Sequence, residues 1–124
     1  MLIDEELTGE ILAAATEVHR QLGPGLLESA YEECLCHELS LRGLPFRREV
    51  PLPVTYKGIK LDCGYRLDLV VAEKVILELK SVEDVSPLHK AQLLTYLRLA
   101  DKRVGLLLNF NVALLKDGIT RLVL

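Results

Sequence analysis

The chain has 124 residues, of which 50% are hydrophobic and 5% aromatic, so we expect one domain spanning residues 1–124 with an aliphatic core. Its 15 Lys and Arg against 18 Asp and Glu give a net charge of -3, without the positive excess typical of proteins that hold nucleic acid through phosphates. The high apolar fraction excludes disorder. No apolar run approaches the length of about 20 residues that crosses a bilayer, and the acidic start MLIDEELTGE differs from a signal peptide. We therefore expect a cytoplasmic protein without a membrane partner.

Apolar residues at helical spacing predict two helices near the N-terminus, over residues 4–22 and 27–42. The segment LGPGL separates them, because its proline cannot continue a helix. A third helix is predicted over residues 86–100, since Ser86 suits an N-cap and Pro87 suits the first helical position.

The pattern between the second and third helices is that of extended chain. Short turns at Lys57-Gly58 and at residues 72–74 divide it into three predicted strands, over residues 48–56, 59–71 and 75–81. Pro51 and Pro53 restrict the first to an edge or irregular strand. Beyond the third helix, the sequence predicts a buried strand over residues 103–110 and a hairpin around Asp117-Gly118 within residues 112–124. This order predicts an α/β or α+β fold, with a mixed central sheet flanked by helices and with strands 75–81 and 103–110 parallel.

Charged side chains are expected to share one face of two neighbouring strands. Alternation predicts that Arg66 and Asp68 lie opposite an apolar face formed by Cys63, Tyr65, Leu67, Leu69 and Val71. On the next strand Glu78 and Lys80 share a face, so hairpin pairing would bring Asp68 and Glu78 together. Two ionised carboxylates repel, and a site that holds both usually needs a cation such as Mg²⁺ or Mn²⁺. Lys80 would then hold the attacking water and neutralise charge on a phosphate.

The charged and titratable residues leave alternatives open. Asp68, Glu78 and Lys80 are also compatible with cross-strand ion pairs on a solvated sheet face, although helices over both faces would bury these charges and favour a metal. The basic residues near the first hairpin form either a solvated rim or a set of phosphate contacts: Arg47, Arg48, Lys57 and Lys60. Three cysteines without CxxC spacing favour reduced thiols over disulfides or zinc: Cys34, Cys36 and Cys63.

Two motifs carry a resemblance to known families. Asp68 followed by Glu78-Leu79-Lys80, in this order of elements, resembles the PD-(D/E)xK nuclease superfamily. The segment GLLESAY at residues 25–31 resembles the motif of the GxxExxY protein family within it. The resemblance implies a restriction-endonuclease-like αβββαβ core with an extra N-terminal helix and a C-terminal hairpin. Leu67 stands where the superfamily often has proline, which is a minor departure.

The resemblance also implies roles for particular residues. Asp68, Glu78 and the backbone carbonyl of Leu79 would be metal ligands, and Lys80 would be the catalytic lysine. Glu28 corresponds to a helix carboxylate that many relatives aim at the metal.

The third predicted helix contributes further candidates. Its segment QLLTY is similar to a QxxxY motif, which adds Gln92 and Tyr96 to the catalytic candidates. Read from the residues alone, Glu28 also fits a first helical turn and Tyr96 a core position with its hydroxyl at the rim.

Two functions follow as hypotheses. The first is a metal-dependent nuclease that hydrolyses phosphodiester bonds in DNA or RNA with Mg²⁺ or Mn²⁺. The alternative is a noncatalytic nuclease-fold module that binds a protein or nucleic-acid partner. Under either, the many apolar residues of a short chain favour a homodimer.

Overall fold

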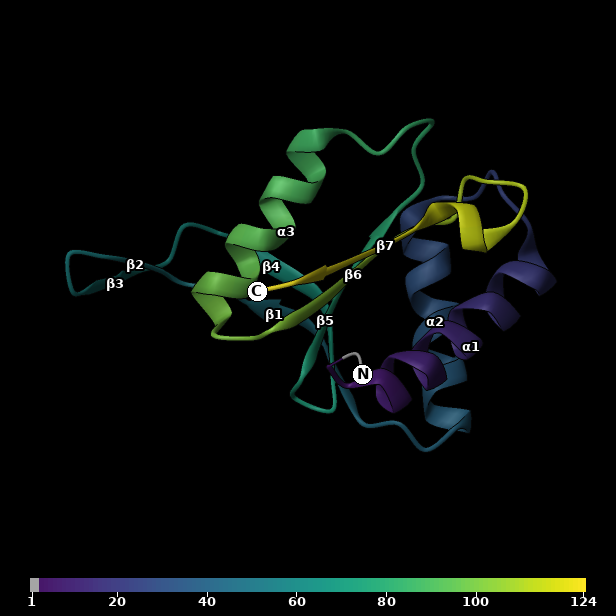
Figure 1. Ribbon diagram of the computed structural model, residues 1–124, viewed down its shortest axis with the longest axis horizontal. Helices are drawn as coiled ribbons and strands as arrows, with labels where there is room; N and C mark the ends of the chain where they lie inside the picture. Colours follow the sequence, from purple (N-terminus) through teal and green to yellow (C-terminus); the bar gives the residue numbers. More distant parts are fainter. Residues whose placement is uncertain (1–2) are drawn as a thin grey trace.

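The computed structural model describes residues 3–124, which form an α+β fold built around a mixed sheet (Figure 1). The helices are α1 (Glu5–Leu22), α2 (Glu28–Leu41) and α3 (Pro87–Ala100), with a short 3-10 helix η1 (Leu115–Gly118). The strands are β1 (Phe46–Pro51), β2 (Val54–Tyr56), β3 (Ile59–Leu61), β4 (Arg66–Val71), β5 (Val75–Lys80), β6 (Val104–Asn109) and β7 (Ile119–Val123). The three predicted helices are confirmed to within one residue at each end.

The main sheet has five strands in the order β1-β4-β5-β6-β7. Strands β5 and β6 are parallel, as predicted from the helix that connects them, and every other neighbouring pair in this sheet is antiparallel. The expected αβββαβ core is therefore confirmed in α2, β1, β4, β5, α3 and β6, with α1 added before it.

Helices cover both faces of the sheet, so charged groups on the central strands are shielded from water. Figure 1 shows α1 and α2 on one side and α3 on the other. The cluster under α1 and α2 includes Leu35, Leu69 and Leu77, whereas the cluster under α3 includes Val70 and Ile76. None of the helices within residues 3–124 is long and apolar enough to span a membrane.

The LGPGL segment turns the chain sharply between α1 and α2. Gly23 and Gly25 have φ of 70° and 97°, which residues with a Cβ adopt only with strain. The hydroxyl of Tyr31 on α2 donates to the carbonyl of Gly23 at 2.6 Å and accepts from the amide of Leu26 at 3.2 Å. Its ring stacks on Phe110 with centroids 4.4 Å apart, so Tyr31 fixes this turn on the core.

Two of the predicted strands are each broken in the middle, although the first lies at the edge of the main sheet, as its prolines predicted. The predicted strand 48–56 ends at Pro51, and Leu52 and Pro53 separate β1 from β2. The predicted strand 59–71 is interrupted at residues 62–65, which separate β3 from β4. Proline cannot donate to a ladder, and this double break releases β2 and β3 from the main sheet as a separate two-stranded hairpin.

The hairpin predicted within residues 112–124 is also wrong. Residues 115–118 form η1 instead, and the remaining segment is the single strand β7, which pairs back with β6. The Asp117-Gly118 pair therefore ends a 3-10 helix rather than forming a hairpin turn. The local sequence predicted a turn here, but the strand that pairs with β7 is β6, which lies before residues 110–118.

Candidate active site

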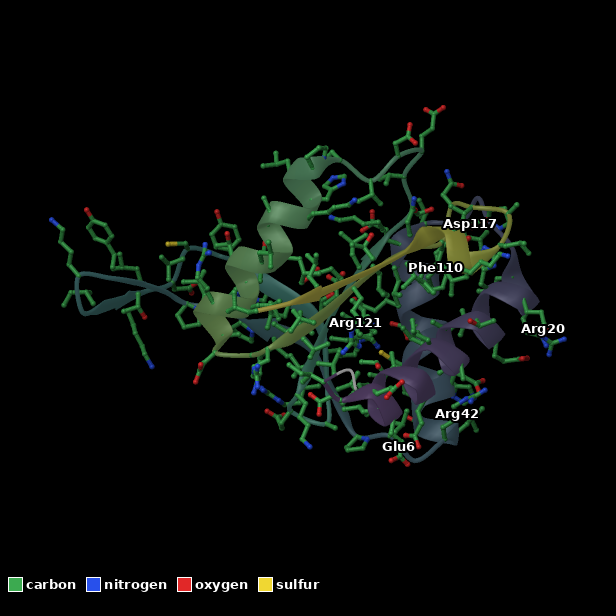
Figure 2. All side chains as sticks on the ribbon, in the orientation of Figure 1. Glu6, Arg20, Arg42, Phe110, Asp117 and Arg121 are labelled. Atoms are coloured by element: carbon green, nitrogen blue, oxygen red, sulfur yellow. The ribbon has the colours of Figure 1, made fainter. Side chains whose placement is uncertain are left out.

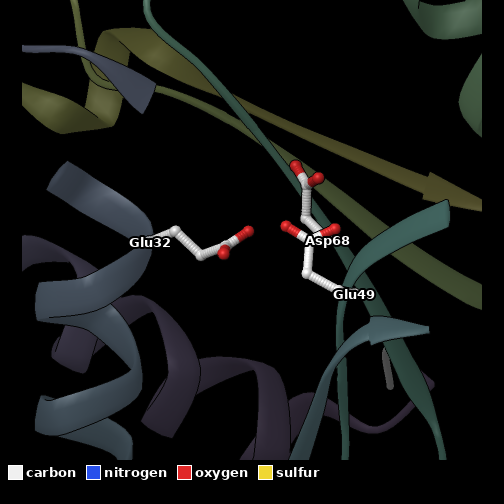
Figure 3. Close-up of side chains that lie close together, drawn as sticks. All are labelled: Glu32, Glu49 and Asp68. Atoms are coloured by element: carbon white, nitrogen blue, oxygen red, sulfur yellow. The ribbon is translucent and has the colours of Figure 1, made fainter. Parts of the chain in front are cut away.

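Three carboxylates from separate elements converge on the α2 side of the sheet. Glu32 points from α2 toward Asp68 of β4 and Glu49 of β1 (Figure 3). One carboxylate oxygen from each of the three lies within 4.8 Å of the other two. Such a concentration of negative charge favours a cation, because carboxylates at this range repel one another.

Two neighbouring strands change face at the same place to bring these side chains together. Leu67 packs in the cluster under α3, whereas Leu69, two residues on, packs in the cluster under α1 and α2. The predicted single apolar face from Cys63 to Val71 is therefore wrong, since regular alternation would keep Leu67 and Leu69 together. On β1, Glu49 has φ of 51°, in the left-handed region. It lies opposite Asp68, because the residues on either side of it pair with those on either side of Asp68.

Asp68 occupies the place where the β4–β5 ladder ends. The last residue pair of that ladder is Leu69 with Leu77. One residue further, the Asp68 carboxylate accepts a hydrogen bond from the Leu79 amide at 2.8 Å. Burial raises the pKa of Asp68, and the Leu79 amide opposes that rise by stabilising the charged form.

Glu78 is the most deeply buried acid of the site. It is 8% exposed, and within residues 3–124 its Oε1 atom has no hydrogen-bond partner. Burial, followed by the charge of Asp68 and a side-chain hydrogen bond with Asp68, raises the pKa of Glu78 to about 9. A buried carboxylate oxygen without a donor is costly, and oxygen ligands of this kind suit Mg²⁺ or Mn²⁺. The donor set therefore fits a divalent cation.

Lys80 lies at the end of β5, two residues beyond Glu78. Its charge lowers the pKa values of Asp68 and Glu78, which shows that the ammonium group lies near both. In the part of the chain that the structure describes, no salt bridge joins Lys80 to a carboxylate. Asp68, Glu78 and Lys80 thus interact without the ion pairs of the solvated-face alternative. They do not share one face, because Leu77 and Leu79 pack under α1 and α2 and alternation turns Glu78 and Lys80 toward α3. Glu78 lies outside the group of Glu32, Glu49 and Asp68.

The chain after Lys80 is held by a buried asparagine. Asn109 on β6 is 3% exposed; its side-chain amide donates to the Val82 carbonyl at 2.9 Å, and its Oδ1 accepts from the Val82 amide at 3.1 Å. The Phe110 amide also donates to the Lys80 carbonyl at 2.9 Å. These bonds fix the end of β5 and thereby the base of the Lys80 side chain.

Glu32 and Glu49 were missed by the sequence reasoning. Glu32 is buried and pairs with Arg48 at 2.7 Å. The pKa of Glu49 is raised by loss of water and by the carboxylates of Glu32 and Asp68. For Glu32 a signal existed, because it lies one turn after Glu28 on the same helix face. For Glu49 the sequence held no such signal, because its side chain turns to the α2 side of the sheet through a positive φ at that residue.

The remaining predicted residues are placed differently. Glu28 is exposed at the first position of α2, and Gln92 is exposed on α3. Tyr96 is 7% exposed, and burial followed by the charge of Glu78 raises its pKa, so its ring lies on the site's α3 side. His89, one turn before Gln92, completes a capping box with Ser86.

Comparison with known families agrees with this geometry. A family model described as the PD-(D/E)XK nuclease superfamily matches residues 5–122. The chain belongs to the PD-(D/E)XK nuclease superfamily. No curated protein and no solved structure matches it. Superfamily membership supports a nuclease-type function with divalent metal and nucleic-acid substrate, and the acidic cluster is consistent with the metal requirement.

Proposed function

We propose that the chain hydrolyses phosphodiester bonds in DNA or RNA with Mg²⁺ or Mn²⁺ held chiefly by Asp68 and Glu78. Glu78 carries the proposal, because it is 8% exposed and its Oε1 has no partner among residues 3–124. Its side-chain partner is another acid, Asp68, and burying two acids together is unfavourable unless one keeps a proton or a cation lies between them. A divalent cation would offset both the burial and the repulsion from Asp68.

The proposed ligands are Asp68, Glu78 and the Leu79 backbone carbonyl, with Glu32 approaching from α2. When bound, such a cation lowers the pKa of water and neutralises charge on a phosphate. The charge of Lys80 acts on both Asp68 and Glu78, and its ammonium would hold the attacking water or a phosphate oxygen. Tyr96 would border the substrate on the α3 side.

The finer family assignment is also a proposal. The GLLESAY segment supports membership of the GxxExxY group, and in that reading Glu28 is the helix carboxylate of the site. Glu28 is exposed, whereas Glu32, four residues later, contributes an oxygen within 4.8 Å of oxygens of Asp68 and Glu49. We therefore propose that Glu32 performs the role and that Glu28 lies at the entrance. Gln92, also exposed, would contact substrate rather than metal.

The decisive experiment is cleavage of labelled single- and double-stranded DNA and RNA with Mg²⁺ or Mn²⁺. We expect Glu78→Gln and Lys80→Ala to reduce the rate at least about a hundredfold, the scale of losing a group that acts on the reacting atoms. Glu73→Gln and Lys74→Ala are matched controls, because both residues are exposed at the opposite end of β5. Cleavage that persists in the Glu78 and Lys80 variants would mean that a contaminant cuts the substrate.

The helix carboxylate is tested by a matched pair on α2. Glu32→Gln should weaken Mn²⁺ binding in calorimetry more than Glu28→Gln, because only Glu32 lies in the cluster. The reverse order would return the role to Glu28. No Mn²⁺ uptake and no cleavage by the unmodified protein would instead favour the noncatalytic module.

We also propose that the chain forms a homodimer, which light scattering of the purified protein would detect. We propose a cytoplasmic location, which fractionation of cells that express the protein would check.

A further inference from the structure

The hairpin of β2 and β3, residues 54–61, stands away from the rest of the molecule (Figure 1). Its two strands pair only with each other, and their side chains extend into open space at the left of Figure 2. We call residues 54–61 the hairpin arm. Its base is fixed, because Leu52 is 4% exposed in the core under α3 and its amide donates to the Tyr65 carbonyl at 2.9 Å.

One face of the hairpin arm is apolar and uncovered. The register pairs Val54 with Leu61 and Tyr56 with Ile59, so these four side chains share a face. Tyr56 is 61% exposed, Ile59 60% and Leu61 44%. An isolated two-stranded hairpin is marginally stable in water, and a contiguous exposed apolar face marks a binding surface.

The charge of the hairpin arm indicates what it binds. It contains Lys57 and Lys60 and no acidic residue, in a chain whose net charge is -3. Among the described residues neither lysine forms a salt bridge, and the Lys57 ammonium lies 5.5 Å from the centre of the Tyr56 ring. The nearby Arg47 and Arg48 are different, since Arg47 pairs with Glu73 and Arg48 with Glu32 and Glu33. The two lysines are therefore available for phosphate groups, Lys57 at the turn beside Tyr56 and Lys60 on the opposite face of the arm, where it pairs with Thr55.

The hairpin arm is continuous with the candidate active site. It leaves the sheet beyond the Pro51–Arg66 pair, two residues along from Glu49 and Asp68, or about 7 Å at the usual strand rise. Tyr65, which joins the arm to β4, is 43% exposed and packs edge to face on Tyr96 with centroids 5.9 Å apart. Tyr96 is 7% exposed, so the exposed aromatic ring beside the arm's base is that of Tyr65.

We propose that the hairpin arm binds a single-stranded segment of the nucleic-acid substrate next to the scissile phosphate. Unpaired bases would stack on Tyr56 and on Tyr65, while Lys57 and Lys60 would contact phosphates. Stacking on aromatic side chains combined with cationic contacts is the usual basis of single-strand binding. The inference deepens the proposed nuclease function and rests on it for the choice of partner.

Fluorescence anisotropy with a labelled single-stranded oligonucleotide tests the arm in metal-free buffer, where no cleavage occurs. Reversing both lysines, in Lys57→Glu with Lys60→Glu, should weaken binding at least about tenfold. It should also flatten the salt dependence by about 1.4 in logarithmic slope, since each single-strand phosphate contact contributes about 0.7. Tyr56→Ala should weaken binding about fivefold or more by removing a stacking platform.

The matched control reverses two exposed lysines elsewhere, Lys74→Glu with Lys116→Glu, which changes the net charge equally. Unchanged thermal unfolding and Mn²⁺ affinity confirm that the arm variants remain folded. An equal loss of affinity in the control would overturn the inference, because the effect would then be one of net charge. Tighter binding of duplex than of single strand would overturn the stacking role.

A second copy of the chain is the competing occupant of the apolar face. If the arm variants dissociate a dimer in light scattering and leave oligonucleotide affinity unchanged, the inference is wrong. Because binding is measured without catalysis, an inactive protein whose arm still binds single strands would refute only the proposed hydrolysis. An active protein whose arm variants bind normally would refute only the arm.

Discussion

Replacing Glu78 by Gln should stabilise the metal-free protein at neutral and alkaline pH. Burial and the neighbouring charge of Asp68 raise the pKa of Glu78 from 4.5 to about 9. Between these values the folded protein holds a proton that the unfolded chain has released, so stability falls as pH rises. The contribution of Glu78 is complete below pH 4.5 and is lost progressively up to the folded pKa of about 9.

The size of the effect follows from the pKa shift. Each pKa unit corresponds to about 1.4 kcal/mol, and pH 7 lies about 2.5 units above the unfolded value, so Glu78 lowers stability at pH 7 by about 3 kcal/mol relative to acid. Glutamine resembles the protonated acid in shape and does not ionise. The variant should therefore match the wild type near pH 4.5 and exceed its stability by about 3 kcal/mol at pH 7.

Urea unfolding with a chelator present, at several values between pH 4.5 and pH 9, measures this difference. Other acids of the site titrate in both proteins, so the difference between the two curves reports Glu78 together with its coupling to Asp68. A difference that stays constant with pH would refute the reasoning, because it would show that ionisation of Glu78 carries no penalty in the folded protein.

Three further predictions concern the site and its support. Binding of Mn²⁺ at pH 7 should release about one proton, because Glu78 is protonated there in the metal-free protein, and calorimetry in buffers of different ionisation enthalpy would detect it. Tyr31→Phe should lower stability by about 1 kcal/mol through loss of the hydroxyl's bonds to Gly23 and Leu26, whereas the exposed Tyr56→Phe should change little in the same urea titration. A thiol reagent at pH 8 should label two cysteines quickly and Cys36 only on unfolding, since burial raises its pKa to about 11; rapid labelling of all three would contradict this.

Much of the fold was predictable because its signals are local. Apolar spacing located the three helices, and the Ser86-Pro87 pair marked the start of α3. The strands were less predictable, because their limits depend on pairing. Residues 59–71 form a continuous extended pattern, yet β3 pairs with β2 while β4 pairs with β1 and β5. The local pattern does not indicate at which residue the chain changes from pairing with one strand to pairing with another.

The site was predictable where it follows strand alternation and a familiar motif. Glu78 and Lys80 required only the alternation of β5, which is regular. Glu49 and the orientation of Asp68 depend on a change of face in both β1 and β4, and this arises from backbone geometry at Glu49. Glu32 required knowing which turn of α2 lies over the sheet, a matter of tertiary packing rather than of spacing.

The hydrogen bond from the Leu79 amide to Asp68 makes that carboxylate a structural brace as well as a candidate ligand. Asp68→Ala would remove this hydrogen bond between β4 and β5, so loss of activity in that variant could come from lost chemistry or from separation of the two strands. Asp68→Asn keeps an acceptor for the Leu79 amide. A chain of this fold that had abandoned hydrolysis would still have reason to keep an aspartate here. It would have less reason to keep Glu78, which is buried beside Asp68 and whose Oε1 has no donor among residues 3–124. The presence of Glu78 therefore indicates an active enzyme more specifically than the presence of Asp68.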